Sequence, residues 1–260
     1  MKKTLVFITL LALIAVAAAG CAGSRAEQGP ALSHNVARIW FPAERISRFA
    51  LDGKVIEGEV TGQAFMDASA DGRTSIAWVD TTPYFVSESG VDQLGAGIDV
   101  AVVSFDGRYA VYLTEGELRM FSVETRDCTV LMEGVASAQQ IAVSPKSESV
   151  LFTVSLEGEG VTRKTFLYTG GSVQEVYEGR GVIAIAVSDD ASVRYFYDFK
   201  AGAFCADVSG EERVISEKCD NSTNYNFTND LSEVAFRDTE GENHWYRLRD
   251  GRMTDLGGGF

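Results

Sequence analysis

The chain has 260 residues and a formal net charge of −14, and 45% of its residues are hydrophobic. A strongly acidic protein is repelled by phosphate backbones and by anionic headgroups, so the charge argues against nucleic acid and against direct adhesion to anionic lipid. With four prolines and no Pro-rich block after Pro30, the sequence gives no sign of a second linker, and one domain is expected.

The first twenty residues have the three parts of a secretory signal. Lys2 and Lys3 form a short basic start, residues 4–17 are almost wholly apolar, and small residues follow at 18–20. A helix that spans a bilayer needs about 20 apolar residues, so this run is too short and cleavage is expected instead. Residues 1–20 are therefore predicted to be a removable signal peptide.

The segment Ala18-Ala19-Gly20-Cys21 resembles the lipobox of bacterial lipoproteins. The resemblance implies that the Cys21 thiol carries lipid and becomes the mature N-terminus, so that the chain is anchored in the cell membrane and faces outside the cytoplasm. Ala18 stands where the family usually has Leu, and an ordinary secreted protein cut near Ala19 is the competing interpretation. Residues 21–34 are then a flexible tether rich in Gly, Ser and Ala.

Three strands are expected directly after the tether. Val36–Phe41 is mostly apolar and is expected to be a strand, and Ile46–Leu51, the turn Asp52-Gly53 and Lys54–Val60 have the pattern of a hairpin. Together they predict a first unit of three strands.

A short turn then recurs about every 40 residues. Its full form, Ser-x-Asp-Gly-Arg, stands at 69–73 and 104–108, and partial copies begin at Ser144, Ser188 and Thr228. Asp and Ser bond to the nearby backbone and Gly supplies a positive φ, so we expect five equivalent turns, called anchor turns below. Apolar strands precede them. Second strands are expected at 76–79, 111–113, 151–154, 195–197 and 235–236, third strands at 118–123, 165–168 and 244–248, and fourth strands at 129–131, 173–177 and 213–215.

Four short strands in each unit of about 40 residues is the pattern of a β-propeller blade. Residues 61–257 resemble the TolB-like propellers, relatives of the WD-repeat group, whose blades carry a Ser-x-Asp-Gly turn between the first two strands. The resemblance implies an all-β propeller over residues 35–260 that binds proteins or cell-envelope components. A pair of smaller β-sandwiches is the competing fold.

The expected propeller has about six four-stranded blades, of which the first is incomplete. A closed ring normally completes that blade with a strand from the other terminus. Only Gly257-Gly258-Gly259-Phe260 remain there, too few for a strand. Either the ring is open or the chain has been cut short.

Three cysteines lie in the domain: Cys128, Cys205 and Cys219. An exported chain can oxidise a pair. If residues 209–212 form a hairpin turn, Cys205 faces Ser216 instead of Cys219. A disulfide requires Cα atoms closer than about 7 Å, so this pair is not favoured, and Cys128 is left over in any case.

The residues that usually carry metal chemistry are scarce. His34 lies in the tether, and His244 lies in an expected strand, where it is interpreted as a packed or surface residue. No His/Cys cluster has zinc spacing. The run 220–226 offers oxygens at alternate positions, as a calcium loop does, but Tyr225 stands where Gly is needed and Leu231 where a bidentate Glu belongs.

No catalytic or cofactor motif is found either. The sequence has no Gly-x-Ser-x-Gly, and the glycine runs at 95–97 and 257–259 lack the strand-then-helix setting of a phosphate loop. Trp40, Trp78 and Trp245 could line a sugar or peptide site, but aromatics on strands are usually core. No catalytic, cofactor or metal residue is therefore predicted.

The leading functional hypothesis is a non-catalytic module that binds a protein or an envelope component, held at the membrane through lipid on Cys21, with no nucleic-acid partner. One alternative is a propeller hydrolase or lyase that uses loop carboxylates, because carboxylate pairs act without histidine. The candidates for it are Asp99, Asp189, Asp190 and Asp230. Another alternative is a ligand-sensing subunit of an envelope complex.

Overall fold

The computed structural model describes residues 36–41, 46–51, 54–61, 64–69, 72–79, 82–88, 90–94, 98, 100–158 and 162–257. Of these, residues 36–41, 46–51, 54–61, 64–67, 77–79 and 82 are described by their backbone alone. The predicted signal peptide and tether, with Cys21 and His34, lie outside these ranges. Within them, no helix is long and apolar enough to cross a membrane.

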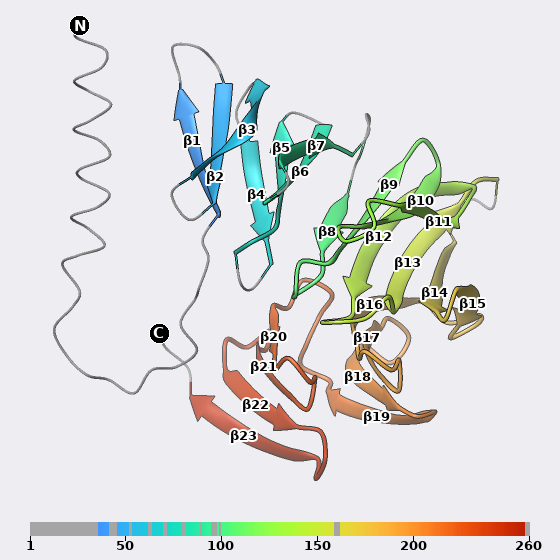
Figure 1. Ribbon diagram of the computed structural model, residues 1–260. Helices are drawn as coiled ribbons and strands as arrows, with labels where there is room; N and C mark the ends of the chain where they lie inside the picture. The colour runs from blue at the N-terminus through green and yellow to red at the C-terminus, as the bar shows by residue number, and fades with distance from the viewer. Residues whose placement is uncertain are drawn as a thin grey trace, which may run out of the picture. The chain divides into compact units, whose positions relative to one another are not determined.

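The described elements are all strands, and they form six antiparallel sheets in chain order (Figure 1). The first sheet has β1 (Val36–Phe41), β2 (Ile46–Leu51) and β3 (Lys54–Thr61); the second has β4 (Ala64–Ala68), β5 (Ser75–Val79), β6 (Thr82–Ser87) and β7 (Gly90–Gln93). The third has β8 (Ala101–Val103), β9 (Tyr109–Thr114), β10 (Glu117–Ser122) and β11 (Cys128–Met132); the fourth has β12 (Val135–Val143), β13 (Val150–Leu156), β14 (Arg163–Thr169) and β15 (Ser172–Val176). The fifth has β16 (Val182–Val187), β17 (Val193–Asp198), β18 (Ala203–Val208) and β19 (Glu211–Ser216); the sixth has β20 (Tyr225–Phe227), β21 (Glu233–Arg237), β22 (Asn243–Arg247) and β23 (Arg252–Gly257).

Each sheet is a meander in which every strand pairs with the next one along the chain. The all-β class and the repeated four-stranded unit that the sequence predicts are therefore confirmed. Each predicted strand overlaps an observed one. The short turns decide this topology, because a tight turn returns the chain antiparallel beside the strand that it has just left.

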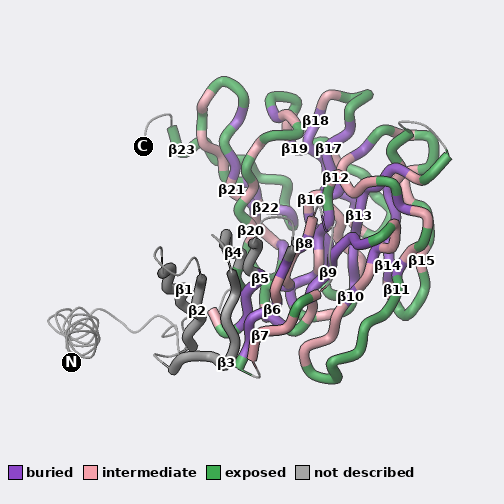
Figure 2. The backbone as a smooth tube through the Cα atoms, turned by 90° about the horizontal axis from the view of Figure 1, so that it is seen from above, coloured by how far each residue is buried: buried purple, intermediate pink, exposed green. Residues whose placement is uncertain are grey.

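Successive sheets pack face to face through apolar side chains. Phe85 of the second sheet lies in one cluster with Tyr112 of the third, and Leu118 of the third lies in another with Phe152 of the fourth. The fifth and sixth sheets share a cluster that contains Phe204 and others. Figure 2 shows buried residues concentrated in the inner strands, whereas β23 is exposed throughout. Burial on both faces of the inner strands explains why their sequences are continuously apolar.

Three of the anchor turns, those that begin at Ser104, Ser188 and Thr228, share one local geometry. Ser104 Oγ donates to Asp106 Oδ1 (2.9 Å) and accepts from the backbone N of Tyr109 (3.0 Å), while Asp106 Oδ1 accepts from the backbone N of Arg108 (3.1 Å). Gly107 has the expected positive φ of 74°. The turns that begin at Ser188 and Thr228 repeat this pattern of bonds. The turn that begins at Ser144 differs from the expected pattern, because Lys146 stands in place of the Asp and the backbone N of Ser147 donates to Ser144 Oγ (3.2 Å).

Two of the three partial copies keep the backbone without the glycine. Ala191 and Leu231 occupy the glycine position with φ of 57° and 55°. In both turns the preceding carboxylate binds the same backbone amide as in the complete motif, through Asp190 and Asp230. The Ser/Thr and Asp side chains therefore fix this turn even where the residue type at the positive-φ position is unfavourable.

Consecutive anchor turns are also joined to one another. The backbone N of Asp106 donates to the carbonyl of Pro145 (3.1 Å), and the backbone N of Lys146 donates to Asp189 Oδ1 (2.7 Å). Farther along, the Tyr195 hydroxyl donates to the carbonyl of Leu231 (2.7 Å). We call the side of the sheets that carries these turns the anchor edge.

The cysteines are not joined in this structure. Cys205 and Cys219 are buried free thiols, and Cys128 is an exposed one whose Sγ lies 3.3 Å from the hydroxyl of Tyr112. The prediction that Cys205 faces Ser216 is wrong, because a β-bulge shifts the pairing of β18 with β19. The register shifts after Phe204, so Ser216 pairs with Phe204 and Cys205 pairs with Val214.

Candidate functional site

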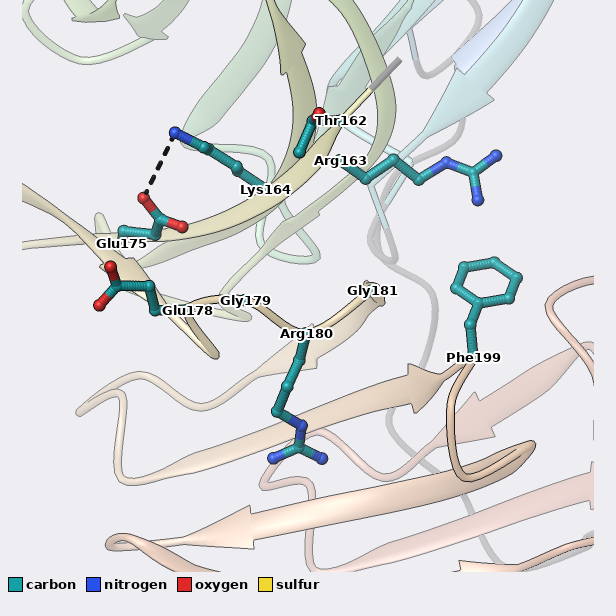
Figure 3. Close-up of a pocket in the computed structure, with 9 residues that line it drawn as sticks. All are labelled: Thr162, Arg163, Lys164, Glu175, Glu178, Gly179, Arg180, Gly181 and Phe199. Carbon is teal, nitrogen blue, oxygen red and sulfur yellow. Dashed lines mark ion pairs between the residues drawn. The ribbon is translucent and has the colours of Figure 1, made fainter. Parts of the chain in front are cut away.

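A groove of about 660 Å³ lies between the fourth and fifth sheets, on the side away from the anchor turns. Strand direction alternates, so the start of β14, the end of β15, the start of β16 and the end of β17 all point away from the anchor edge; we call this side the groove edge. The groove is lined by Thr162, Arg163, Lys164, Glu175, Glu178, Gly179, Arg180, Gly181 and Phe199 (Figure 3). Its volume is typical of ligand sites, which span ~300–1,000 Å³.

Arg180 holds the link between the two sheets in place. Its Nη1 binds both carboxylate oxygens of Glu212 (2.6 and 2.7 Å), and its Nη2 binds Asp198. The hydrogen bond that Arg180 donates to Glu212, more than any other contact, raises the pKa of Arg180 above its ordinary value. Burial alone would raise the pKa of Asp198, but the hydrogen bond from Arg180 and two backbone N–H groups lower it overall. Arg180 is therefore engaged by the protein itself.

Arg163 and Phe199 form one end of the groove. The guanidinium carbon of Arg163 lies 5.0 Å from the centre of the Phe199 ring, and the ring is 38% exposed. Arg163 also faces solvent, and among the described residues no carboxylate pairs with it. A guanidinium that stacks on an aromatic face keeps its edge N–H donors available, and these suit the planar bidentate binding of a carboxylate.

Two glutamates form the other end. Figure 3 shows Glu175 and Glu178 close together, on the side away from Arg163 and Phe199. Lys164 Nζ lies 3.8 Å from Glu175 Oε2, a long ion pair at a partly exposed position. Glu178 is exposed and makes no contact of this kind with any described residue. The groove therefore presents positive and negative charge at separate places.

Two buried threonines join the sheets beneath the groove. Thr153 and Thr165 lie opposite each other on β13 and β14, with their hydroxyl oxygens 2.9 Å apart. Thr153 Oγ1 accepts from the backbone N of Ala184 (2.9 Å), and Thr165 Oγ1 donates to the carbonyl of Val182 (3.2 Å). These bonds pair polar groups of β16 that burial would otherwise leave without partners.

The carboxylates that the sequence proposes for an enzyme lie on the anchor edge, with structural partners. Ser188 and Ser192 both donate hydrogen bonds to Asp190. These bonds, of which the one from Ser188 has the largest effect, lower the pKa of Asp190 to about 2. Asp189 accepts from the backbone of Lys146, and Asp230 from that of Ser232. Asp99 lies outside the described residues.

The remaining candidates are also dispersed. The side chains of Trp40 and Trp78 are not described, and Trp245 is 43% exposed on β22. In the run 220–226, Asp220 accepts from Ser222 and Thr223 in a local turn. Across the described part of the chain, no cluster of His, Cys, Asp or Glu could hold a metal ion.

His244 has a more specific environment than the sequence predicts. Its Nε2 lies 2.9 Å from Asp238 Oδ2 and its Nδ1 lies 2.8 Å from Asp255 Oδ1. Burial alone would lower the pKa of His244, but the two carboxylates raise it overall. Both ring nitrogens face carboxylate oxygens, an arrangement that favours the imidazolium form, in which both are donors. Asp238 precedes His244 by six residues and directly follows β21, and the pairing of β21 with β22 brings the two side chains together.

The sequence also gives little sign of the groove. Arg163 begins β14, Glu178 lies between β15 and β16, and Phe199 follows β17. None of the three lies in a recognisable motif. The one available signal is the pair of glycines around Arg180, which interrupts the strand pattern between β15 and β16.

No protein-family model matches the sequence, and a search of curated proteins finds no match. Solved structures are similar in fold. TolB from Acinetobacter baumannii has a TM-score of 0.52 and 13% identity over 86% of this chain and 63% of its own length. The dihydro-heme d1 dehydrogenase NirN has a TM-score of 0.55 and 14% identity over 90% of this chain and 55% of its own length. The oligogalacturonate lyase from Vibrio parahaemolyticus has a TM-score of 0.55 and 11% identity over 86% of this chain and 72% of its own length.

The chain thus has a propeller-type fold like that of TolB, as its repeat predicts. It spans less than two thirds of the length of TolB and of NirN. The similar structures include enzymes as well as TolB, and identities of 11–14% relate them to this chain by fold alone.

Proposed function

We propose that the chain is an extracytoplasmic lipoprotein, anchored in the cell membrane through lipid on Cys21, whose propeller is a non-catalytic binding module for a protein or a cell-envelope component. The observation that carries the binding role is the groove between the fourth and fifth sheets. Its exposed groups, Arg163, Phe199 and Glu178, offer hydrogen bonds, an aromatic surface and charge to a ligand.

The anchoring part of the proposal rests on the leader, where small residues directly precede Cys21. Expression in the host with labelled fatty acid should place label on the wild-type protein and none on Cys21→Ser, while the variant keeps its fold. Absence of label from the wild-type protein would contradict the anchor and leave the binding role to be tested separately.

The binding part is tested by crosslinking intact host cells from the outer face and identifying the captured partner. We expect one specific partner for the wild-type protein and its loss when Arg163→Gln is combined with Phe199→Ala. Lys218→Gln is the matched control, because it removes one positive charge from an exposed pair with Glu240 on the sixth sheet. A partner set identical to that of an unrelated lipoprotein would refute the binding role.

The two alternatives from the sequence predict different results. A propeller hydrolase or lyase would lose turnover when Asp190 or Asp230 is replaced by Asn, although both carboxylates are bonded within their own turns. A ligand-sensing subunit would be captured with its envelope complex only when the ligand is present.

We also propose that the six sheets form an open propeller whose seam lies between residues 36–60 and 224–256. An unpaired edge exchanges its amide hydrogens quickly. Hydrogen exchange should therefore be faster in these two segments than in the rest of the domain. Uniform protection across both would mean that the ring closes.

A further inference from the structure

We propose that the groove between the fourth and fifth sheets binds an extended peptide segment that carries both an acidic and a basic residue. The acidic side chain lies against Arg163 over Phe199, and the basic one lies beside Glu178. This inference rests on the proposed binding function and names the chemistry of its ligand.

The positive end of the groove suits a carboxylate. The guanidinium carbon of Arg163 lies over the Phe199 ring, 5.0 Å from its centre, and no carboxylate of the described residues uses its N–H donors. Two parallel N–H donors of a guanidinium match the two oxygens of a carboxylate, and such bidentate pairs are among the strongest hydrogen bonds in proteins. The exposed ring gives the adjoining apolar part of the ligand a surface to bury.

The negative end decides against a purely anionic ligand. Glu178 is exposed at the opposite end, and Glu175 beside it is paired with Lys164 only at 3.8 Å. The whole chain carries a net charge of −14, so its field repels a free anion. A segment with both charges avoids this repulsion and finds a complementary group at each end.

The floor between the two ends is backbone. Gly179 and Gly181 carry no side chains; a Cβ added at Gly179 would meet no atom within 4 Å, and one added at Gly181 would meet only the Phe199 side chain, at 3.9 Å. This gap lets an extended main chain approach closely. A neutral oligosaccharide could also rest on Phe199, but it would leave Arg163 and Glu178 without charged partners.

Gly181 provides a way to block the groove. Its φ lies outside the left-handed region and its Cβ would make an ordinary contact, so Gly181→Leu should fill the floor without straining the backbone. The variant should abolish peptide binding with an unchanged melting temperature.

The test uses the full-length mature protein in neutral detergent and fluorescent heptapeptides with acetylated and amidated ends. One series carries Glu and Lys with one to four neutral residues between them, in both orders. The comparison peptides carry Glu alone, Lys alone, or Gln in place of both. Fluorescence anisotropy at low salt gives the affinities. We expect at least one Glu/Lys peptide to bind about tenfold more tightly than either single-charge peptide.

Variants then show which groove residue binds each charged side chain of the peptide. Arg163→Gln should remove the preference for Glu over Gln but keep that for Lys, and Glu178→Gln should do the reverse. Lys218→Gln should change neither. Equal binding of dipolar and single-charge peptides, no binding of any peptide, displacement by a neutral oligosaccharide alone, or a Glu preference that survives Arg163→Gln would each overturn the inference.

The crosslinking experiment separates the two failures. If a specific partner is captured equally well by the wild-type protein and by the combined variant Arg163→Gln and Glu178→Gln, the binding module stands and the peptide site is wrong. If the wild-type protein captures no specific partner, the proposed function itself fails.

Discussion

The anchor edge and the groove edge of the propeller differ in how their polar groups are used. On the anchor edge, Ser104 and Asp106 bond to their own turn, and the backbone of Asp106 bonds to the next turn along. On the groove edge, Arg180 is equally well paired, but Arg163 and Glu178 keep their charges toward solvent. The first edge uses its polar groups for the fold, and the second leaves some available for a ligand.

This difference follows from the connections at each edge. An anchor turn joins two strands of one sheet in five residues, so its side chains reach its own backbone. The groove edge carries the links from one sheet to the next. The link from β15 to β16 at the groove, residues 177–181, has five residues like an anchor turn, but it joins two sheets instead of two strands of one sheet. Surface connections of this kind often carry binding groups.

The largest effect is expected at the contact between two anchor turns. A Cβ at Gly107 would lie 2.8 Å from Thr74 Oγ1 and 3.0 Å from Ser69 Cβ, with φ at +74°. Gly107→Val should lower the free energy of unfolding by about 2–5 kcal/mol, because backbone strain and overpacking add. Gly134→Val is the matched control, since Gly134 has φ +70° and open space around it. Urea unfolding that gives equal losses for both variants would show that the turns do not interlock.

The next effect concerns the polar bridge beneath the groove. Thr153→Val removes the acceptor of the Ala184 backbone N–H and leaves that buried donor unpaired. The free energy of unfolding should fall by about 1–3 kcal/mol. Thr254→Val on the exposed strand β23 is the control and should change stability little. If the two variants unfold at the same urea concentration, the fourth and fifth sheets are not joined by this bond.

The imidazolium of His244 should make the stability of the sixth sheet depend on pH. Its pKa is raised above the ordinary 6.5, so its contribution is complete below pH 6.5 and is lost as the pH rises through the higher folded value. The pKa of Asp238 is lowered, so its contribution is lost at acidic pH. We expect a loss of no more than about 1 kcal/mol above neutrality, because Asp255 is exposed.

His244→Gln serves as the control for this pH dependence. The free energy of unfolding in urea should differ between the wild-type protein and the variant, and this difference should be larger at pH 6 than at pH 8. An identical pH dependence in both proteins would contradict the imidazolium bridge.

The smallest effect has the opposite sign. Ala191 holds φ at 57°, which costs an L-residue about 1–2 kcal/mol, whereas glycine adopts it freely. The greater entropy of glycine in the unfolded chain offsets part of that gain, so Ala191→Gly should stabilise the protein by up to about 1 kcal/mol. Ala201→Gly, in an exposed turn without positive φ, should destabilise it. Destabilisation by both variants would mean that the Ser188 turn does not have the geometry of the Ser104 turn.

The sequence by itself determined the strands and the anchor turns. Alternating polarity and turn residues act within a few positions, so the repeat around Ser69 and Ser104 was sufficient to place the β-meanders. The sequence showed the copies at Ser188 and Thr228 only as partial, because Ala191 and Leu231 stand where the motif has Gly. Asp190 and Asp230 nevertheless hold the backbone in the conformation of the complete turn.

Only the tertiary structure decided which side chains meet. Arg163 and Phe199 come from different sheets, and their contact exists because the fourth and fifth sheets pack face to face. The register of β21 against β22 likewise places Asp238 beside His244. Local turn chemistry reaches a few residues along the chain, whereas the site depends on how one sheet packs against the next, where Arg163 and Phe199 stand 36 residues apart in sequence, and no short pattern encodes that arrangement.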